Sequence, residues 1–223
     1  MTANKYGTIL TIVLIVLVIA IIGGIIAIVY NNEIKPNDEY NEMQQAIADF
    51  NINVEEKEEE DKEYTDNQNT TTNPVEREDS SNNNYKKKTY YKGYVMAGYI
   101  TISATNVSLP ILDHETPETL NTAVVIRYPS NAKLNEPGNV VIAGHNYKNN
   151  QFFSNNKKLT VGDKIKIKDD TGKELLYTIY EKFETTIEDT SFYNRDTNGA
   201  IEITLTTCTD DAKARTIILA RAE

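Results

Sequence analysis

Eight short strand-like runs, separated by turn signals, most constrain what this chain can fold into. They lie at 98–102, 107–112, 123–128, 139–144, 164–169, 174–183, 200–207 and 215–222. Within the fifth run, Lys and Ile alternate strictly, which is typical of a strand with one face in water. An open sheet of this size would leave exposed edges. We therefore expect a mainly β domain, an eight-stranded β-barrel with short helices, with a β-sandwich as the alternative.

The N-terminal region predicts a membrane anchor. From Ile9 to Val29 the chain has 21 residues without a charge, enough to cross a hydrocarbon core of about 30 Å as a helix. A cleaved signal peptide is the rival interpretation, but its apolar region is roughly 7–15 residues and ends on a small-residue cleavage site. Lys5 precedes the run and several acids follow it. We therefore expect residues 1–8 in the cytoplasm and everything after Tyr30 outside the cell membrane.

Residues 30–88 are expected to form an acidic extracellular linker. Of the formal net charge of −10, residues 31–88 carry −9. Their low apolar content predicts a disordered stalk that catalysis does not require. Met43, Ile47 and Phe50, spaced four and three residues apart, favour a short helix over 38–51, with a frayed segment as the alternative. No basic stripe with interleaved aromatics indicates a nucleic-acid partner.

Residues 89–223 are expected to be one catalytic domain, and Cys208 is its most informative residue. It is the only cysteine in the chain, so an internal disulfide is excluded. The thiol ends a strand-like run and is followed by the polar residues Thr209-Asp210-Asp211, where a substrate can reach it. A buried apolar role and an intermolecular link are the alternatives to a working thiol.

Two further residues complete a candidate catalytic set. His145 directly follows the apolar run 139–144, and its imidazole can pair with a thiolate or return a proton to a leaving amine. Arg215 begins the last run, and its guanidinium can donate hydrogen bonds to a developing oxyanion. An ion pair between Arg215 and Asp210 or Asp211 is the structural alternative.

These residues resemble the sortases, membrane-bound cysteine transpeptidases of Gram-positive bacteria. The run Thr204-Leu205-Thr206-Thr207-Cys208 matches the TLxTC signature, and Arg215 falls where that family has its arginine. The run from Asn139 to His145 is similar to the strand that delivers the family's histidine. The likeness extends over roughly 95–223. It implies the sortase-type β-barrel, with Cys208 as nucleophile, His145 as acid/base and Arg215 as the substrate and oxyanion residue.

The resemblance also implies substrates. An LPxTG-like sorting signal of a secreted surface protein is cleaved after its Thr, the acyl group passes to the cysteine, and a peptidoglycan precursor or cross-bridge amine resolves the thioester. We expect further substrate contacts from Thr206 and Thr207, and from Ile187 and Phe192 in the 184–199 loop. No cofactor is implied. We expect no metal, because calcium commonly takes 6–8 oxygen ligands and residues 130–138 offer one acid, Glu136.

The spacing between His145 and Cys208 indicates which class of sortase the chain resembles. Residues 146–207 leave no room for the long helical insertion of class B sortases. The lid and second membrane segment usual in the pilin-polymerising class C are also missing from the sequence. The resemblance is therefore to class A or the similar classes D and E. A thiol hydrolase of wall peptides, a pilin-polymerising sortase and a non-enzymatic surface adhesin are the alternative functions.

Overall fold

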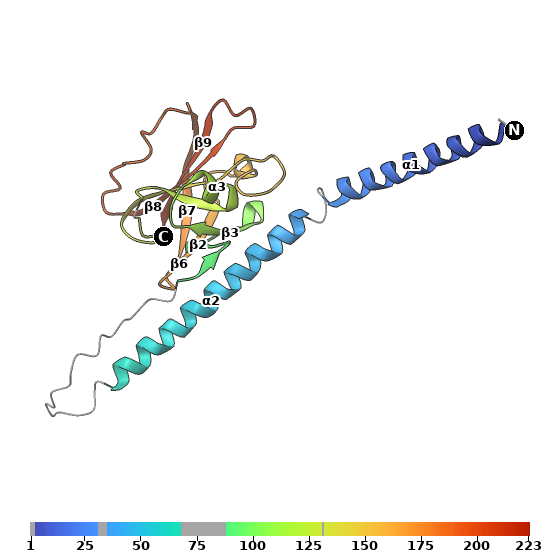
Figure 1. The fold of residues 1–223 in the computed structure, drawn as a ribbon. Helices are drawn as coiled ribbons and strands as arrows, with labels where there is room; N and C mark the ends of the chain where they lie inside the picture. Colours follow the sequence, from blue (N-terminus) through green and yellow to red (C-terminus); the bar gives the residue numbers. More distant parts are fainter. Residues whose placement is uncertain (1–2, 31–34, 68–87, 131) are drawn as a thin grey trace. The chain divides into compact units, whose positions relative to one another are not determined.

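The computed structural model describes residues 3–30, 35–67, 88–130 and 132–223 (Figure 1). The α-helices are α1 (Ala3–Val29), α2 (Lys35–Asn67) and α3 (Pro117–Thr122), and two 3-10 helices span Ser103–Thr105 and Asn156–Lys158. The strands are β1 (Tyr90–Tyr91), β2 (Tyr94–Ile102), β3 (Val107–Leu112), β4 (Val124–Tyr128), β5 (Gly138–Ala143), β6 (Lys164–Asp169), β7 (Glu174–Thr185), β8 (Ile201–Cys208) and β9 (Arg215–Ala222). Each of the eight runs expected from the sequence is a strand, and only the two-residue β1 is additional.

The strands β2 to β9 form a closed barrel. Neighbouring strands follow the order β2-β3-β4-β5-β8-β9-β7-β6, and β6 pairs with β2 to close the ring. This closure confirms the predicted barrel, and the β-sandwich alternative is wrong. Two neighbouring pairs, β3–β4 and β5–β8, are parallel, whereas the other pairs are antiparallel. The parallel pair β5–β8 is the one that matters for the active site.

The closing contact between β2 and β6 depends on a glycine. Gly98 lies opposite Asp169, and a Cβ atom at Gly98 would come within 2.3 Å of the Lys168 carbonyl oxygen. No side chain fits at that distance, so the two backbones approach closely only because residue 98 is glycine. Inside the barrel, Ile100 and Ile167 from these two strands are fully buried beside Tyr177 of β7.

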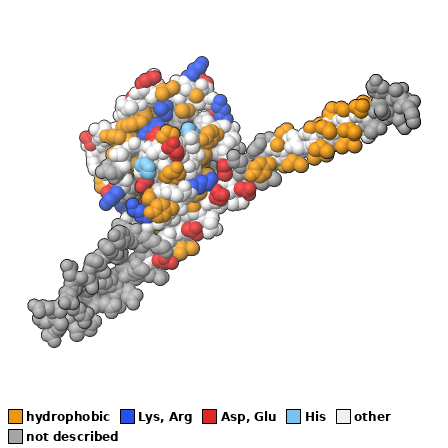
Figure 2. Space-filling view, in the orientation of Figure 1, with side chains coloured by type: hydrophobic (Ala, Val, Ile, Leu, Met, Phe, Trp, Pro, Cys, Tyr) orange, Lys and Arg blue, Asp and Glu red, His pale blue; other side chains and the backbone are white. Residues whose placement is uncertain are grey.

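Helix α1 carries the predicted membrane-spanning segment. Its residues Ile9–Val29 form a stretch that is long and apolar enough to cross a membrane, by length and composition. None of that stretch is buried within the protein. Figure 2 shows hydrophobic side chains covering the described part of α1, whereas hydrophobic and charged side chains are mixed on the barrel. An apolar helix with no protein partner is what a bilayer anchor requires.

Helix α2 departs most from the sequence-based expectation. The short helix expected over 38–51 is confirmed, but it is longer than expected, because Lys35–Asn67 is one continuous helix. The prediction of a disordered stalk is wrong for the rest of this helix, while 68–87 lie outside the described residues. From Met43 onward the helix belongs to the same compact unit as the barrel, Met43–Glu223. The folded unit that contains the barrel therefore begins at Met43 and not at Thr89.

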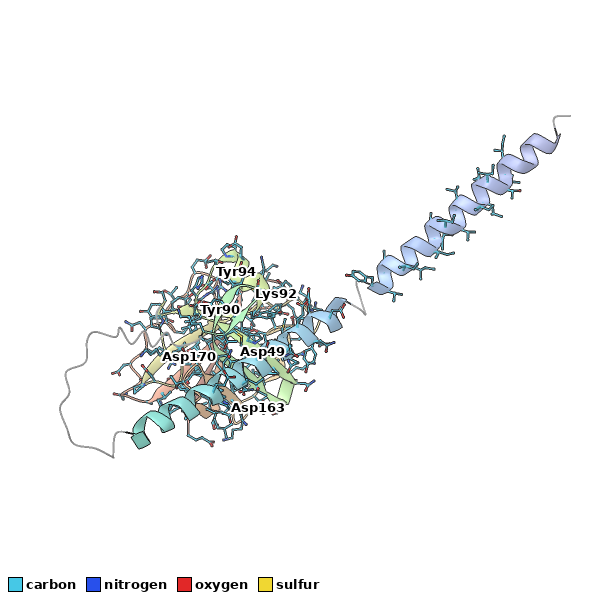
Figure 3. All side chains as sticks on the ribbon, turned by 60° about the horizontal axis from the view of Figure 1, so that its bottom comes forward. Asp49, Tyr90, Lys92, Tyr94, Asp163 and Asp170 are labelled. Carbon is cyan, nitrogen blue, oxygen red and sulfur yellow. The ribbon has the colours of Figure 1, made fainter. Side chains whose placement is uncertain are left out.

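A narrow apolar stripe explains the docking of α2. Met43, Ile47, Phe50 and Val54 recur at the spacing of one helical face and are all buried. The Phe50 ring meets Tyr99 of β2 edge to face, with ring centroids 5.9 Å apart. A polar bond flanks the stripe: Lys168 Nζ donates to Asn51 Oδ1 at 3.0 Å. Figure 3 shows the described side chains of this helix and of the barrel, with Asp49 of α2 labelled. Averaged over the acidic segment, this stripe is too sparse to raise the apolar content, which is why composition concealed it.

We predict that Phe50→Ala destabilises the segment 35–223 by about 3–5 kcal/mol in urea-induced unfolding, because Phe50 is 1% exposed within the core. Ile52→Ala is the matched control, since Ile52 lies on the same helix but is 53% exposed. A difference below about 1 kcal/mol between the two variants would show that α2 does not unfold together with the barrel.

Candidate active site

The parallel pairing of β5 with β8 determines where His145 and Cys208 lie. The register runs from Gly138 opposite Ile201 to Ala143 opposite Thr206, and Gly144 N still donates to Thr206 O at 3.2 Å. Because the strands are parallel, their carboxyl ends meet at one rim of the barrel. His145 and Cys208 therefore leave neighbouring strands at the same rim, as the sequence predicted for an imidazole and a thiol that work together.

Gly144 is required immediately before the histidine. A Cβ atom at this position would lie 2.8 Å from both Phe153 and Val124. The Phe153 ring is fully buried and closes the barrel beneath the rim, and Phe153 N donates to His145 O at 3.1 Å. Packing under Gly144 thus holds the backbone that carries the imidazole.

Arg215 is the direct cross-strand partner of Cys208. The two residues form the last register pair of the antiparallel strands β8 and β9. Side chains of directly opposed residues emerge on the same face of a sheet, with Cβ atoms about 4.5–5.5 Å apart. The guanidinium Nε donates to Ile187 O at 3.3 Å, while Asp210 binds Lys157 Nζ at 2.7 Å. The alternative ion pair of Arg215 with Asp210 is thus not the arrangement in this structure.

The His145 ring has its own set of neighbours. Nε2 lies 2.9 Å from Asn121 Oδ1 at the end of α3, and the ring is tilted against that of Tyr147, with centroids 4.8 Å apart. Partial burial lowers the pKa of His145, and the positive charge of Arg127 lowers it further. The carboxylate of Glu115 acts in the opposite direction. The net effect favours the neutral imidazole.

Arg127 and Glu115 form a bidentate pair beside the histidine. Arg127 Nε and Nη2 donate to the two carboxylate oxygens at 2.6 and 2.5 Å. Glu115, Asn121, Arg127 and His145 line a surface hollow of about 580 Å³. Sequence reasoning missed Asn121, Arg127 and Glu115, because no local pattern links them to a histidine 18 to 30 residues away along the chain.

Cys208 opens into a second hollow, of about 350 Å³, lined also by Asn146, Thr207, Asp210 and Asp211. Asn146 Nδ2 donates to Cys208 O and to Asp210 Oδ1, both at 3.0 Å, which ties the loop after β5 to the turn after β8. Within the described part of the chain, no hydrogen bond joins Cys208 Sγ to the His145 ring. Catalytic hydrogen bonds are often long in a resting enzyme and shorten only when substrate is bound.

The predicted substrate-contacting residues divide by face. Side chains alternate along a strand, so Thr206 shares the outer face with Cys208, whereas Thr207 shares the inner face with Leu205. Both threonines are buried, and their hydroxyls have no hydrogen-bond partner among the described residues. Of the two loop residues, Ile187 is 43% exposed, whereas Phe192 is 2% exposed and packs on Val141, Ile217 and Leu219. Phe192 therefore supports the loop from beneath.

The positions of the described acidic residues bear on metal binding. Over the described ranges, no three His, Cys, Asp or Glu side chains gather as metal ligands do. Glu136 lies 3.7 Å from Lys133, and Asp189 accepts a hydrogen bond from Thr185 at 2.5 Å.

Comparison with known proteins identifies the family. A family model described as Sortase domain matches residues 100–223. The chain belongs to the sortase family. It is therefore a cysteine transpeptidase, and an adhesin without catalytic activity does not fit this assignment.

Solved sortase structures agree with this fold. A sortase D5 transpeptidase of Clostridium perfringens is 27% identical, with a TM-score of 0.59 over 82% of this chain and 99% of that one. Sortase C of Streptococcus pneumoniae (20%, TM-score 0.56, 80% and 96% covered) and sortase A of Listeria monocytogenes (23%, 0.52, 57% and 87%) show the shared fold. No curated protein sequence matches this one significantly.

We predict that the pKa of His145 lies below its ordinary value of 6.5 in the folded domain, as followed by NMR titration of the imidazole Hε1 signal. Arg127→Gln should raise this pKa, because it removes a nearby positive charge and leaves Glu115 unneutralised. Glu115→Gln is the matched control and should lower it further. If the two variants shift the pKa in the same direction, these charges do not determine it.

Proposed function

We propose that this sortase cleaves an LPxTG-like sorting signal after its Thr and transfers the protein to a cell-wall amine. The observation that carries the proposal is the cross-strand pair of Cys208 and Arg215 at the rim where β5 delivers His145. A nucleophile, a proton carrier and a fixed cation on one rim are the parts that acyl transfer needs. Their support comes from backbone pairing, which holds them without any contribution from the substrate.

The proposed first half-reaction forms a thioester. The Cys208 thiolate attacks the Thr carbonyl carbon of the signal, and the carbonyl oxygen becomes an oxyanion that Arg215 stabilises with its N–H donors. The proton that the Cys208 thiol loses passes to His145, and the imidazolium gives it to the nitrogen of the departing Gly as the C–N bond breaks. The acyl group is then bound to Sγ, and the C-terminal fragment leaves as an amine.

In the proposed second half-reaction, His145 accepts a proton instead of donating one. An amine of a peptidoglycan precursor or cross-bridge attacks the thioester carbonyl, and neutral His145 takes the proton that the amine loses. The C–S bond breaks, Cys208 recovers its thiolate, and a new amide bond joins the protein to the wall. The lowered pKa of His145 suits proton acceptance in this step.

The position of the membrane anchor fits this reaction. We propose that Ile9–Val29 crosses the cell membrane once, with the N-terminus in the cytoplasm and the catalytic domain outside. Lys5 on the short flank supports this orientation. Both sorting signals and wall amines are then on the same side of the membrane as Cys208.

We also propose an anchoring role, as in classes A, D or E, over pilin polymerisation. The connection 186–200 between β7 and β8 contains no helix, which is unlike the insertion expected of class B. A solved relative above 25% identity, the sortase D5 transpeptidase, supports this choice. The class C structures are similar at the level of fold.

Acceptor dependence separates transfer from hydrolysis. When residues 35–223 act on an LPxTG-containing peptide with triglycine present, we expect mass spectrometry to find the Thr–triglycine ligation product. Cys208→Ala should abolish both the thioester adduct and the product, because it removes the only thiol. Release of free Thr acid at a rate that triglycine leaves unchanged would favour the thiol hydrolase, and turnover by Cys208→Ala would refute the mechanism.

For Arg215, we predict that replacement by Ala or Lys lowers kcat/KM by on the order of 10²–10³ while the Tm stays within about 2 °C of wild type. The Lys variant keeps the charge but loses the planar fork of donors. A purely structural role through Ile187 O would instead lower the Tm and leave the kinetics near normal. Near-normal kcat/KM in Arg215→Ala would remove this residue from the site.

A further inference from the structure

A buried carboxylate lies on the same strand face as the thiol. Glu202 is 1% exposed, and alternation along β8 places Glu202, Thr204, Thr206 and Cys208 on one face. Six residues of strand, about 20 Å, separate this carboxylate from the thiol. Its oxygens accept hydrogen bonds from Arg221 Nε and Tyr180 OH, both at 2.8 Å, and lie 2.7–2.8 Å from Nη2 of Arg221 and of Arg195.

The segment 186–200, called the 186–200 connection here, joins β7 to β8. Arg195 lies within it and links it to the Glu202 carboxylate. Arg195 Nη1 donates to Tyr180 OH at 2.7 Å, and Nη2 donates to Asn139 Oδ1 at 3.0 Å. The amide of Asn139 in turn donates to the backbone carbonyl oxygens of Phe192 and Tyr193, at 3.1 and 2.9 Å. Residues 192–195, in the middle of the connection, are thus held to the barrel by side chains of β5, β7 and β8.

The opposite end of the connection meets the catalytic rim. Ile187 O accepts the hydrogen bond from Arg215 Nε, and between the two ends Phe192 is buried on Val141, Ile217 and Leu219. The 186–200 connection therefore runs along the outer face of β8, from the arginine beside the thiol to the carboxylate at the start of the strand. Between these ends the face is buried, so a peptide bound at Cys208 would meet the connection at its Ile187 end.

We propose that Glu202, acting through Arg195 and Asn139, is a positioning residue that holds the 186–200 connection as one wall of the groove for the acyl-donor peptide. This inference rests on the proposed function. The network is an unusual choice for stability alone, because buried ion pairs are often matched or exceeded by apolar residues of similar size. Its geometric effect is specific: it fixes the backbone carbonyls at 192 and 193 and the side chain at 195 relative to the strand that carries the nucleophile.

The charge state of the network is consistent with a permanent anchor. Burial alone would raise the pKa of Glu202, but hydrogen bonds from Arg221, Tyr180 and Arg195 lower it overall. The Glu202 carboxylate therefore stays ionised at neutral pH, and the ion pairs that it makes with Arg195 and Arg221 are kept at that pH.

The two arginines provide a matched pair of variants. Arg195 and Arg221 each donate to Glu202, but Arg195 lies in the connection whereas Arg221 lies on β9. We expect Arg195→Gln to raise KM for the sorting peptide about tenfold or more, with kcat changed less than twofold, because a freed wall weakens peptide binding without altering the rim. Arg221→Gln should leave KM within about twofold of wild type, even if both variants lose similar Tm.

A second readout separates this inference from the proposed function. Hydrogen exchange of the backbone amides in 186–200 should quicken in Arg195→Gln and stay unchanged in Arg221→Gln. Labelling of Cys208 by a small methanethiosulfonate should be equally fast in both, because that reagent needs no groove. Asn139→Ala, which breaks the bonds to the carbonyls at 192 and 193 without uncovering Glu202, should reproduce the Arg195→Gln pattern if Arg195→Gln fails to fold.

The outcomes are distinct. If wild type turns over no LPxTG-like peptide, the proposed function fails, and the exchange data still test the anchor. Equal KM values and equal exchange in Arg195→Gln and Arg221→Gln would overturn the positioning role, even with normal transpeptidation.

Discussion

The parallel pairing of β5 with β8 is the contact on which the rest of this enzyme depends. Six consecutive register pairs hold these strands together, and they bring two distant parts of the chain to one rim. The antiparallel return of β9 then adds Arg215 directly opposite Cys208. A shift of one residue in either register would turn the thiol to the other face of the sheet. The backbone ladder therefore brings the three groups to one rim, and the side chains of Asn146 and Asn121 add contacts at the end of that ladder.

Much of this fold could be predicted because its signals are local. Alternating Lys and Ile in β6, and Gly or Pro between runs, identify strands from a few residues each. Which strand pairs with which depends on residues far apart in the sequence. The sequences of β5 and β8 themselves therefore did not predict that these strands pair in parallel. The same limit applies to the site. The signature around Cys208 pointed to the nucleophile, whereas the contact of His145 with Asn121 arises only when α3 is placed over the rim.

Helix α2 shows why composition failed where periodicity succeeded in part: the spacing of Met43, Ile47 and Phe50 predicted a helix over 38–51. The segment 31–88 is strongly acidic overall, and that average predicted disorder. Folding, however, requires only that one helical face match a complementary surface, and four side chains spaced over three turns suffice here. The compact unit accordingly begins at Met43, whereas the sequence had placed the start of the folded domain at residue 89.

Along the outer face of β8, the hydrogen bonding of the side chains becomes less complete toward Cys208. Glu202 has every carboxylate oxygen hydrogen-bonded, and Thr204 Oγ1 donates to Asn139 Oδ1 at 2.8 Å. Thr206, one step from Cys208 on the same face, has a buried hydroxyl without a partner. An unsatisfied buried polar group costs about 1–3 kcal/mol, and such groups in native proteins call for an explanation. On this face of β8, the side chains of Glu202 and Thr204, which anchor the 186–200 connection, have their hydrogen bonds made, whereas the hydroxyl of Thr206, next to the thiol, is unpaired among the described residues.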